Sequence, residues 1–228
     1  MTKVSIIVPC YNCENTVRHT LDSLAAQTLK DIELIVLNDG STDHTPEILQ
    51  DWKDAHPEIR VNLVNKENEG IAATRQMGVS LVTGKYFGFL DSDDYTVPEM
   101  FEELYELAER DQLDVAVSDF YWKNSQGERL EKEGPYGIGP DMMVHLFAVL
   151  WNKLYRKSIL DQYAIRLDSS VSFCEDFIFN LEYLLHCKTV FPLQIPIYYY
   201  VKTDGSLVAQ NLDLAKIVRM KTSIYEYY

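Results

Sequence analysis

The sequence has little positive charge and no long apolar run. Its 228 residues include 21 Lys and Arg against 35 Asp and Glu, which gives a net charge of −14. Such an acidic chain is poorly suited to bind nucleic-acid phosphates, so we expect no nucleic-acid partner. No apolar stretch approaches the ~20 residues that span a bilayer, and residues 1–3 lead into a strand pattern without a signal peptide. We therefore expect a cytoplasmic protein.

The common glycine-rich phosphate-binding motifs are also absent. Neither a Gly-x-Gly-x-x-Gly pattern nor a P-loop follows the first strand pattern. A bound diphosphate would therefore not be held by a glycine-rich turn at a helix N-terminus. Its charge would have to be neutralised by a metal ion together with a cation such as Arg75.

Cysteine is scarce, and its spacing fits no zinc site. The four cysteines are Cys10, Cys13, Cys174 and Cys187. Cys10 and Cys13 follow a strand pattern and precede a helix pattern, which is the setting of a thioredoxin-like redox pair. We expect reduced, partly buried thiols, with the redox pair as the alternative.

The first half of the sequence alternates strand and helix patterns. Strands are predicted at 4–8, 33–37, 60–64, 86–90 and 114–121, and helices at 14–27, from Thr45 onward, at 71–82 and at 98–110. The first strand is expected to break at Pro9, and Thr45 is expected to be the N-cap before Pro46 at the first helical position. This β-α-β order predicts an α/β fold with a mostly parallel sheet flanked by helices.

The second half has a mixed pattern and a smaller α+β character. Residues 123–140 are rich in turn formers and are expected to form a mobile loop. Further elements are predicted near 142–150 (helix), 152–163 (short element), 176–187 (helix), 190–200 (strands) and 212–228 (helix). We divide the chain into residues 1–122, residues 123–205 of the same domain, and a C-terminal helical extension over residues 206–228.

Polar clusters follow four of the predicted strands. They lie at 9–12, 38–40, 65–70 and 91–94. Ligands of open α/β sheets bind beyond the carboxyl ends of the strands. We therefore expect these four clusters, which are far apart in the sequence, to form one binding edge.

Three acidic residues, Asp91, Asp93 and Asp94, follow the strand pattern at 86–90. Carboxylates repel one another, so their delivery to one point suggests a hard divalent cation, Mg²⁺ or Mn²⁺. A solvated acidic turn is the alternative. Tyr11 offers a flat face for a pyrimidine base and Asp39 an acceptor for its imide N–H; ordinary packing and a turn before Gly40 are the alternatives.

Order and spacing of the motifs resemble the family-two inverting glycosyltransferases. The resemblance rests on residues 4–12 (VSIIVPCYN), 35–43 (IVLNDGSTD), 68–75 (NEGIAATR) and 90–94 (LDSDD), and more weakly on 152–155 (NKLY) and 174–177 (CEDF). It implies a GT-A fold, a Rossmann-like sheet with an acceptor-side portion, a nucleotide-sugar donor that is usually UDP-linked, and a divalent metal, Mg²⁺ or Mn²⁺. Gln76 and Cys13 depart from the residues that the family often has.

By position, the resemblance implies a role for each residue of the site. Nucleotide-binding residues would be Pro9, Tyr11, Asp39, Asn68, Gly70, Arg75, Asp91 and Ser92, with Asp93 and Asp91 at the metal. The base that deprotonates the acceptor hydroxyl would be Asp176 or Glu175. We favour Asp176, because neighbouring helical residues point about 100° apart and only one can face the donor; the alternative is that both acids complement the helix dipole. Trp151 and Lys153 are expected on the acceptor side, with a surface lysine as the alternative.

The predicted function is transfer of a hexosyl or N-acetylhexosaminyl group to a glycan or lipid-linked saccharide in cell-surface polysaccharide or glycolipid synthesis. The alternatives are a sugar-nucleotide nucleotidyltransferase and a non-catalytic nucleotide-sugar-binding module. The apolar pattern at 212–228 stops without a capping signal. We therefore expect a chain trimmed from a longer protein, which could form a homodimer. Membrane contact, peripheral at the inner face, would come only from the missing C-terminal region.

Overall fold

The computed structural model describes residues 1–132, 149–168 and 175–202. Its first part alternates strands and helices. These are β1 (Val4–Cys10), α1 (Val17–Ala25), β2 (Ile32–Asp39), α2 (Thr45–Ala55), β3 (Arg60–Lys66), α3 (Ile71–Ser80) and β4 (Tyr86–Phe89). The remainder contains β5 (Tyr95–Thr96), α4 (Met100–Arg110), β6 (Val115–Asn124), β7 (Gly127–Glu131), β8 (Lys153–Arg156), α6 (Lys157–Tyr163), α7 (Glu175–Leu184) and β9 (Val190–Val201).

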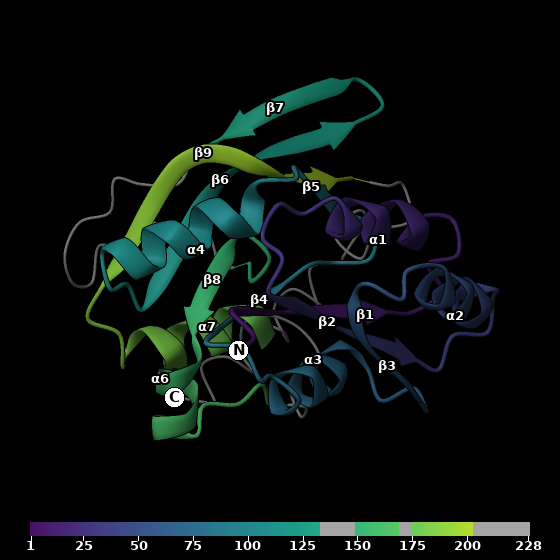
Figure 1. The fold of residues 1–228 in the computed structure, drawn as a ribbon, viewed down its shortest axis with the longest axis horizontal. Helices are drawn as coiled ribbons and strands as arrows, with labels where there is room; N and C mark the ends of the chain where they lie inside the picture. The colour runs from purple at the N-terminus through teal and green to yellow at the C-terminus, as the bar shows by residue number, and fades with distance from the viewer. Residues whose placement is uncertain (133–148, 169–174, 203–228) are drawn as a thin grey trace, which may run out of the picture.

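A single sheet connects all these strands (Figure 1). The strand order is β3-β2-β1-β4-β8-β6-β9-β5, and β7 pairs with β6 outside this path. β1 to β4 are parallel, β8 is antiparallel to both β4 and β6, and β6 runs parallel to β9. The prediction of an α/β fold with a mostly parallel sheet is confirmed. The sheet includes strands from both sides of residue 122, and the division of the chain there stays a prediction.

Helices cover both faces of the sheet (Figure 1). Ile6 of β1 packs in one core cluster with residues of α1, α2 and α4, whereas Ile7 packs in a second cluster with residues of α3, α6 and α7. Successive side chains of a strand point to opposite faces, so a strand that is apolar at every position fits between two helical layers. Every residue of β1 is buried.

Two predictions about element ends are wrong. β1 continues through Pro9 to Cys10. The carbonyl of Ile7 accepts from Leu90 N, so the backbone polar groups of Ile7 face β4. Those of Pro9, two residues later, face the same side, but β4 has already ended at Phe89. The missing N–H of Pro9 therefore costs no hydrogen bond of the sheet. The N-cap of α2 is His44, while Thr45 is helical and its hydroxyl accepts from Cys13 N at 2.8 Å.

The loop predicted over residues 123–140 is strand in its first part. β7 pairs antiparallel with β6, with Asn124 opposite Gly127 at the turn, and Gln126 N donates to the Asn124 side chain at 2.8 Å. The two-residue strand β5 was not predicted. Most of the helix expected near 142–150 and all of the helix at 212–228 lie outside the described residues.

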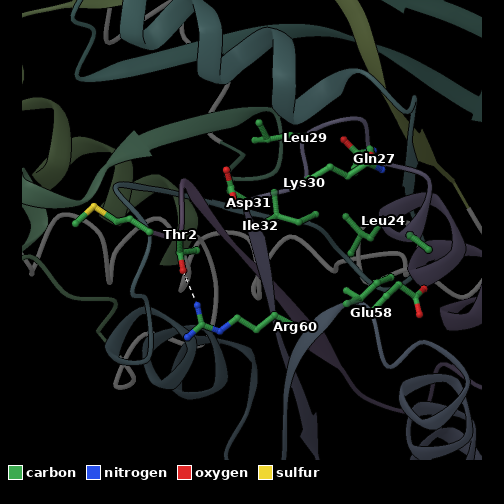
Figure 2. A pocket seen from close by; sticks show the side chains of 12 residues that line it. Thr2, Leu24, Gln27, Leu29, Lys30, Asp31, Ile32, Glu58 and Arg60 are labelled. Carbon is green, nitrogen blue, oxygen red and sulfur yellow. Dashed lines mark hydrogen bonds between the residues drawn. The ribbon is translucent and has the colours of Figure 1, made fainter.

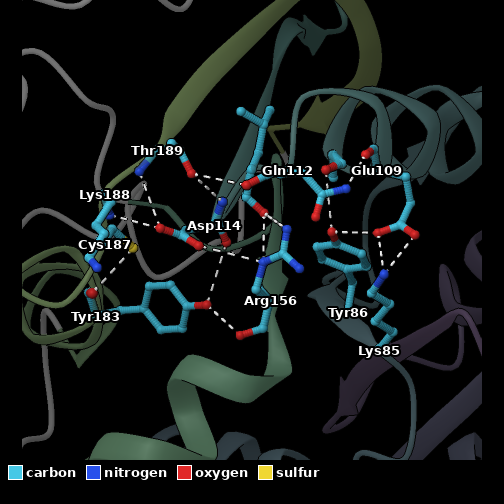
Figure 3. Close-up of polar contacts among 12 residues, drawn as sticks. Lys85, Tyr86, Glu109, Gln112, Asp114, Arg156, Tyr183, Cys187, Lys188 and Thr189 are labelled. Atoms are coloured by element: carbon cyan, nitrogen blue, oxygen red, sulfur yellow. Dashed lines mark hydrogen bonds and ion pairs between the residues drawn. The ribbon is translucent and has the colours of Figure 1, made fainter.

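A polar network joins the amino end of β6 to its neighbours (Figure 3). The Arg156 guanidinium donates to Leu113 O, at 3.0 Å from Nε and 2.7 Å from Nη2. Asp114 accepts from the backbone N–H groups of Lys188 and Thr189 at 2.7 and 3.2 Å. The network therefore ties β6, β8 and the start of β9 together at the edge opposite the predicted site.

No helix in the described part of the chain has both the length and the apolar character that crossing a bilayer requires.

Candidate active site

The turns that follow the parallel strands are joined by hydrogen bonds, as the predicted convergence requires. Asn12, after β1, donates its backbone N–H to Ser41 Oγ at 3.0 Å and accepts from Thr42 N at 2.8 Å. The turn after β2 also depends on Gly40, which has a φ of +68°, and a Cβ there would lie 2.7 Å from Asn68 N. Only glycine fits both constraints.

Asp39 is a buried anchor for the turn after β3. Its carboxylate accepts from Lys66 Nζ at 2.5 Å and from the backbone N–H groups of Glu69 and Gly70, both at 3.0 Å. Burial opposes ionisation of Asp39, but the hydrogen bonds from Lys66 and Glu69 outweigh it and hold its pKa below the ordinary value. The predicted contact with a nucleobase would have to use the remaining acceptor capacity of this carboxylate.

Tyr11 and Pro9 lie at the carboxyl end of β1 with opposite exposure. Pro9 is buried within the strand, whereas Tyr11 is 53% exposed. An aromatic ring exposed to this extent has a free face on which a planar base can stack. Asn68, on the neighbouring turn, is also exposed.

The three acids after β4 do not converge on one point. Asp94 N donates to Asp91 O at 3.1 Å, which closes a turn over residues 91–94 that we call the acid turn. Asp94 is 1% exposed, and its carboxylate accepts from Tyr198 OH at 2.6 Å and from Val201 N at 2.7 Å. Burial and the charges of Asp93 and Asp91 raise its pKa well above the ordinary value. Asp94 thus points into the core, and the expectation of three gathered carboxylates is wrong.

Arg75 links the acid turn to α7. Its guanidinium donates to Asp91 Oδ1 at 2.7 Å and to Glu175 Oε1 at 2.6 Å, and the residue is 7% exposed. Burial alone would favour neutral Arg75, but the carboxylates of Asp91 and Glu175 hold its pKa above the ordinary value. Both terminal nitrogens are therefore engaged by carboxylates. In this state the arginine organises two acidic segments instead of presenting both nitrogens to a ligand.

Asp93 is the acid of this turn whose environment fits a cation. Burial and the charge of Asp91 raise its pKa to about 6, and no side chain of the described residues forms a hydrogen bond or ion pair with its carboxylate. Within the described ranges no three His, Cys, Asp or Glu side chains gather as a complete metal site. A divalent ion would relieve the charge of Asp93 and Asp91 and would need further oxygen ligands from a bound molecule.

Asp176 lies in the first turn of α7, next to Glu175. Burial and the negative charge of Glu175 raise the pKa of Asp176 to about 6. Its Oδ1 accepts from Phe177 N at 2.7 Å. Glu175 is 8% exposed and paired with Arg75, so of the two predicted bases Asp176 is the one that no cation pairs with in the described structure. A carboxylate with a pKa near 6 is suited to accept a proton at neutral pH.

Trp151 and Lys153 are both interior residues. Lys153 is fully buried, with Nζ donating to Val149 O at 2.7 Å and to Asn152 Oδ1 at 2.8 Å. Trp151 stacks on Tyr198 with ring centroids 4.2 Å apart. The alternative of a surface lysine is therefore wrong, and the acceptor-side role of both residues stays a prediction.

Sequence reasoning missed the residues that support the site. Thr20 of α1 places its hydroxyl within hydrogen-bond distance of two backbone carbonyls of the acid turn, and Tyr198 of β9 donates to Asp94. Both would have been assigned to packing, since Thr20 occupies an inward position of an amphipathic helix and Tyr198 a buried position of a strand. Neither residue type indicates a distant polar partner.

Cys10 and Cys13 are both free thiols, as is Cys187, whereas Cys174 lies outside the described residues. The pKa of Cys13 is lowered to about 7, and that of Cys10 is raised well above the ordinary value. The hydrogen bond between the two thiols is the largest cause of each change. Both thiols are buried, and their reduced state and the alternative of a redox pair stay predictions.

A separate cavity of about 330 Å³ lies at the opposite edge of the sheet (Figure 2). Thr2, Ile32 and Arg60 line it, at the amino ends of β1, β2 and β3. Arg60 donates there to Thr2 Oγ1 at 2.7 Å. None of the predicted site residues lines this cavity, so it is not part of the candidate site.

Comparison with known proteins agrees with this architecture. A sequence profile described as "Glycosyl transferase family 2" matches residues 5–171. The uncharacterized glycosyltransferase EpsJ of Bacillus subtilis (strain 168) is 33% identical over 244 residues, which covers 99% of this chain and 70% of EpsJ.

Two solved structures share the fold. S. aureus TarS 1–349 in complex with UDP-GlcNAc has a TM-score of 0.80 at 23% identity, covering 96% of this chain and 65% of that chain. The mannosyltransferase PcManGT from Pyrobaculum calidifontis in complex with GDP-Man and Mn²⁺ has a TM-score of 0.72 at 14% identity, covering 98% of this chain and 64% of that chain. This chain thus spans less than two thirds of either solved chain.

Proposed function

Because the chain belongs to glycosyl transferase family 2, we propose that it is an inverting enzyme that transfers a hexosyl or N-acetylhexosaminyl group from a UDP-sugar to an acceptor hydroxyl. The acceptor would be a glycan or lipid-linked saccharide in cell-surface polysaccharide synthesis. The name of EpsJ and the UDP-GlcNAc bound to TarS support this proposal.

The observation that carries the proposal is the bridge from Asp91 through the buried Arg75 to Glu175. It brings the first turn of α7, with Asp176, beside the acid turn after β4. A transferase needs these two features together, because the leaving diphosphate and the attacking hydroxyl lie on opposite sides of the same sugar carbon. A module that only binds nucleotide sugars would have no need for Asp176.

The proposed donor site follows the carboxyl edge of the sheet. Tyr11 would stack on the uracil, with Pro9 beneath it. Asp39, Asn68 and Gly70 would border the base, and Ser92 of the acid turn would lie at the ribose and diphosphate. Arg75 would act mainly by positioning Asp91.

In the proposed reaction Asp176 takes the proton of the acceptor hydroxyl. The hydroxyl oxygen attacks the anomeric carbon in line with the bond to the departing UDP, which breaks as the new glycosidic bond forms. The alcohol is a weak nucleophile until it loses this proton, so the base contributes directly to the rate. Glu175 is a poorer candidate for this base, because its carboxylate is already ion-paired with Arg75. Asp91 and Asp93 would hold a Mg²⁺ or Mn²⁺ ion that neutralises charge on the leaving UDP.

We predict that UDP raises the melting temperature only when Mg²⁺ or Mn²⁺ is present. Without a divalent cation, the diphosphate would meet the carboxylate of Asp93 and that of Asp91, whose ion-pair partner Arg75 is shared with Glu175. Thermal unfolding with UDP in Mn²⁺ and in EDTA measures this, since a ligand that binds only the native state at 100 times its Kd adds about 2.7 kcal/mol. Asp93→Ala is the matched variant and should lose the UDP effect. Equal stabilisation in EDTA would show that the metal assignment is wrong.

We further predict that kcat falls below about pH 6, approaching tenfold per pH unit. The raised pKa of Asp176 means that its proton-accepting, ionised form is lost as the pH falls through that value. The profile is measured at saturating UDP-sugar and Mn²⁺, so that protonation of Asp93 affects metal binding and not kcat. A kcat that stays constant from pH 5 to 8 would exclude Asp176 as the base.

Release of UDP from a UDP-sugar panel with and without glycan acceptors tests the function itself. Acceptor-dependent release identifies a glycosyltransferase. Tight donor binding with no release under any condition would instead support the non-catalytic binding module.

A further inference from the structure

The side chain of Asp94 is hydrogen-bonded to a strand that lies far away in the sequence. Its carboxylate accepts from Tyr198 OH at 2.6 Å and from Val201 N at 2.7 Å, at the end of β9. Asp94 is 1% exposed and Tyr198 is fully buried. These bonds connect residue 94 to a strand more than 100 positions later in the chain.

The acid turn is held from the other side by α1. The hydroxyl of Thr20, itself 1% exposed, lies 2.7 Å from Asp94 O and 3.0 Å from Ser92 O. The hydroxyl has one proton, which these two carbonyls share, so one helix holds the backbone of the turn while one strand holds the side chain of Asp94. Asp91, the first residue of the turn, is held in addition by Arg75.

We propose that Asp94 is a positioning residue that holds the acid turn between α1 and β9 so that Asp91 and Asp93 are arranged for a divalent ion before it binds. This inference rests on the proposed function. A turn that carries two neighbouring carboxylates would relax to separate them, because like charges repel. Anchoring through a third, inward-facing acid prevents that relaxation, and supporting groups of this kind affect metal affinity about 10–100-fold.

The chain contains a matched control at the opposite edge of the sheet. Asp114 also accepts from two partners of a later segment, the backbone N–H groups of Lys188 and Thr189 (Figure 3). It precedes the amino end of β6, whereas the acid turn follows the carboxyl end of β4. Removal of the Asp114 carboxylate should destabilise the fold without changing the affinity of the proposed metal site.

The test measures Mn²⁺ binding in the presence of UDP, from the electron paramagnetic resonance signal of free Mn²⁺, well below the melting temperature of each variant. Asp94→Ala should weaken Mn²⁺ binding at least about tenfold. Tyr198→Phe, which removes one of the two bonds, should have a smaller effect in the same direction. Asp94→Asn keeps an acceptor for Val201 N and should restore most of the affinity. Asp114→Ala should lower the melting temperature and leave Mn²⁺ affinity unchanged.

Wild-type affinity in Asp94→Ala overturns the inference, and if that variant does not fold, wild-type affinity in Tyr198→Phe does so. Equal losses in Asp94→Ala and Asp114→Ala would show general destabilisation and also overturn it. Absence of Mn²⁺ binding in the wild-type protein with UDP would refute the metal-dependent donor site, and with it this inference. Wild-type affinity in the variants and equal losses in Asp94→Ala and Asp114→Ala overturn only this inference and leave the proposed function intact.

Discussion

Asp176→Asn should lower kcat by about 10²–10⁴-fold and leave the affinity for UDP within roughly threefold, because a general base acts on the acceptor proton and contributes nothing to donor binding. The substitution keeps the size of the side chain and an oxygen that can still accept from Phe177 N. Turnover is measured by UDP release and affinity by calorimetry with Mn²⁺.

Glu175→Gln is the matched variant, because Glu175 is one residue away and is itself buried. It should keep most of the turnover, since the amide oxygen of glutamine can still accept from Arg75 and Glu175 does not take the acceptor proton in the proposed reaction. Its cost should appear as lower stability, because a buried charge pair is broken. An inactive Glu175→Gln together with an active Asp176→Asn would reverse the assignment of the base.

Arg75→Met should destabilise the protein by about 3–5 kcal/mol and abolish transfer. Removing one partner of a buried ion pair leaves uncompensated charge, here on the buried Glu175 and, to a lesser extent, on the half-buried Asp91. Methionine fills similar space without charge. Urea unfolding gives the free energy, and Arg75→Lys should recover only part of it, because an ammonium cannot bridge two carboxylates as a guanidinium does.

A double-mutant cycle separates this positioning role from direct contact with the nucleotide. Arg75→Met combined with Glu175→Gln should be much less destabilised than the sum of the single variants, since neutral Glu175→Gln no longer needs a cation. If Arg75→Met instead unfolds at the wild-type urea concentration while UDP binding is lost, the arginine acts on the diphosphate directly, as the family resemblance implies.

The local patterns predicted the four parallel strands well, and the roles of the residues at their carboxyl ends stay predictions. Alternation and apolar runs located β1, β2, β3 and β4, and parallel topology then required their carboxyl ends to share one edge. The bonds from Asn12 and Asp39 to the neighbouring turns follow from that arrangement. Local patterns were less reliable at element ends, where β1 continues through Pro9 and a strand begins at Gly127.

The sequence by itself determined the fold class, the family and the edge of the sheet at which we propose the active site, because these depend on the order and periodicity of residues near one another in the chain. Only the tertiary structure decided the side-chain partners. Arg75 meets Glu175 across 100 positions and Asp94 meets Tyr198 across 104. An acid in a turn looks the same in the sequence whether it faces solvent, a cation or the core. Which of these it meets depends on the strand or helix that packs beside it, and that is set by the whole fold.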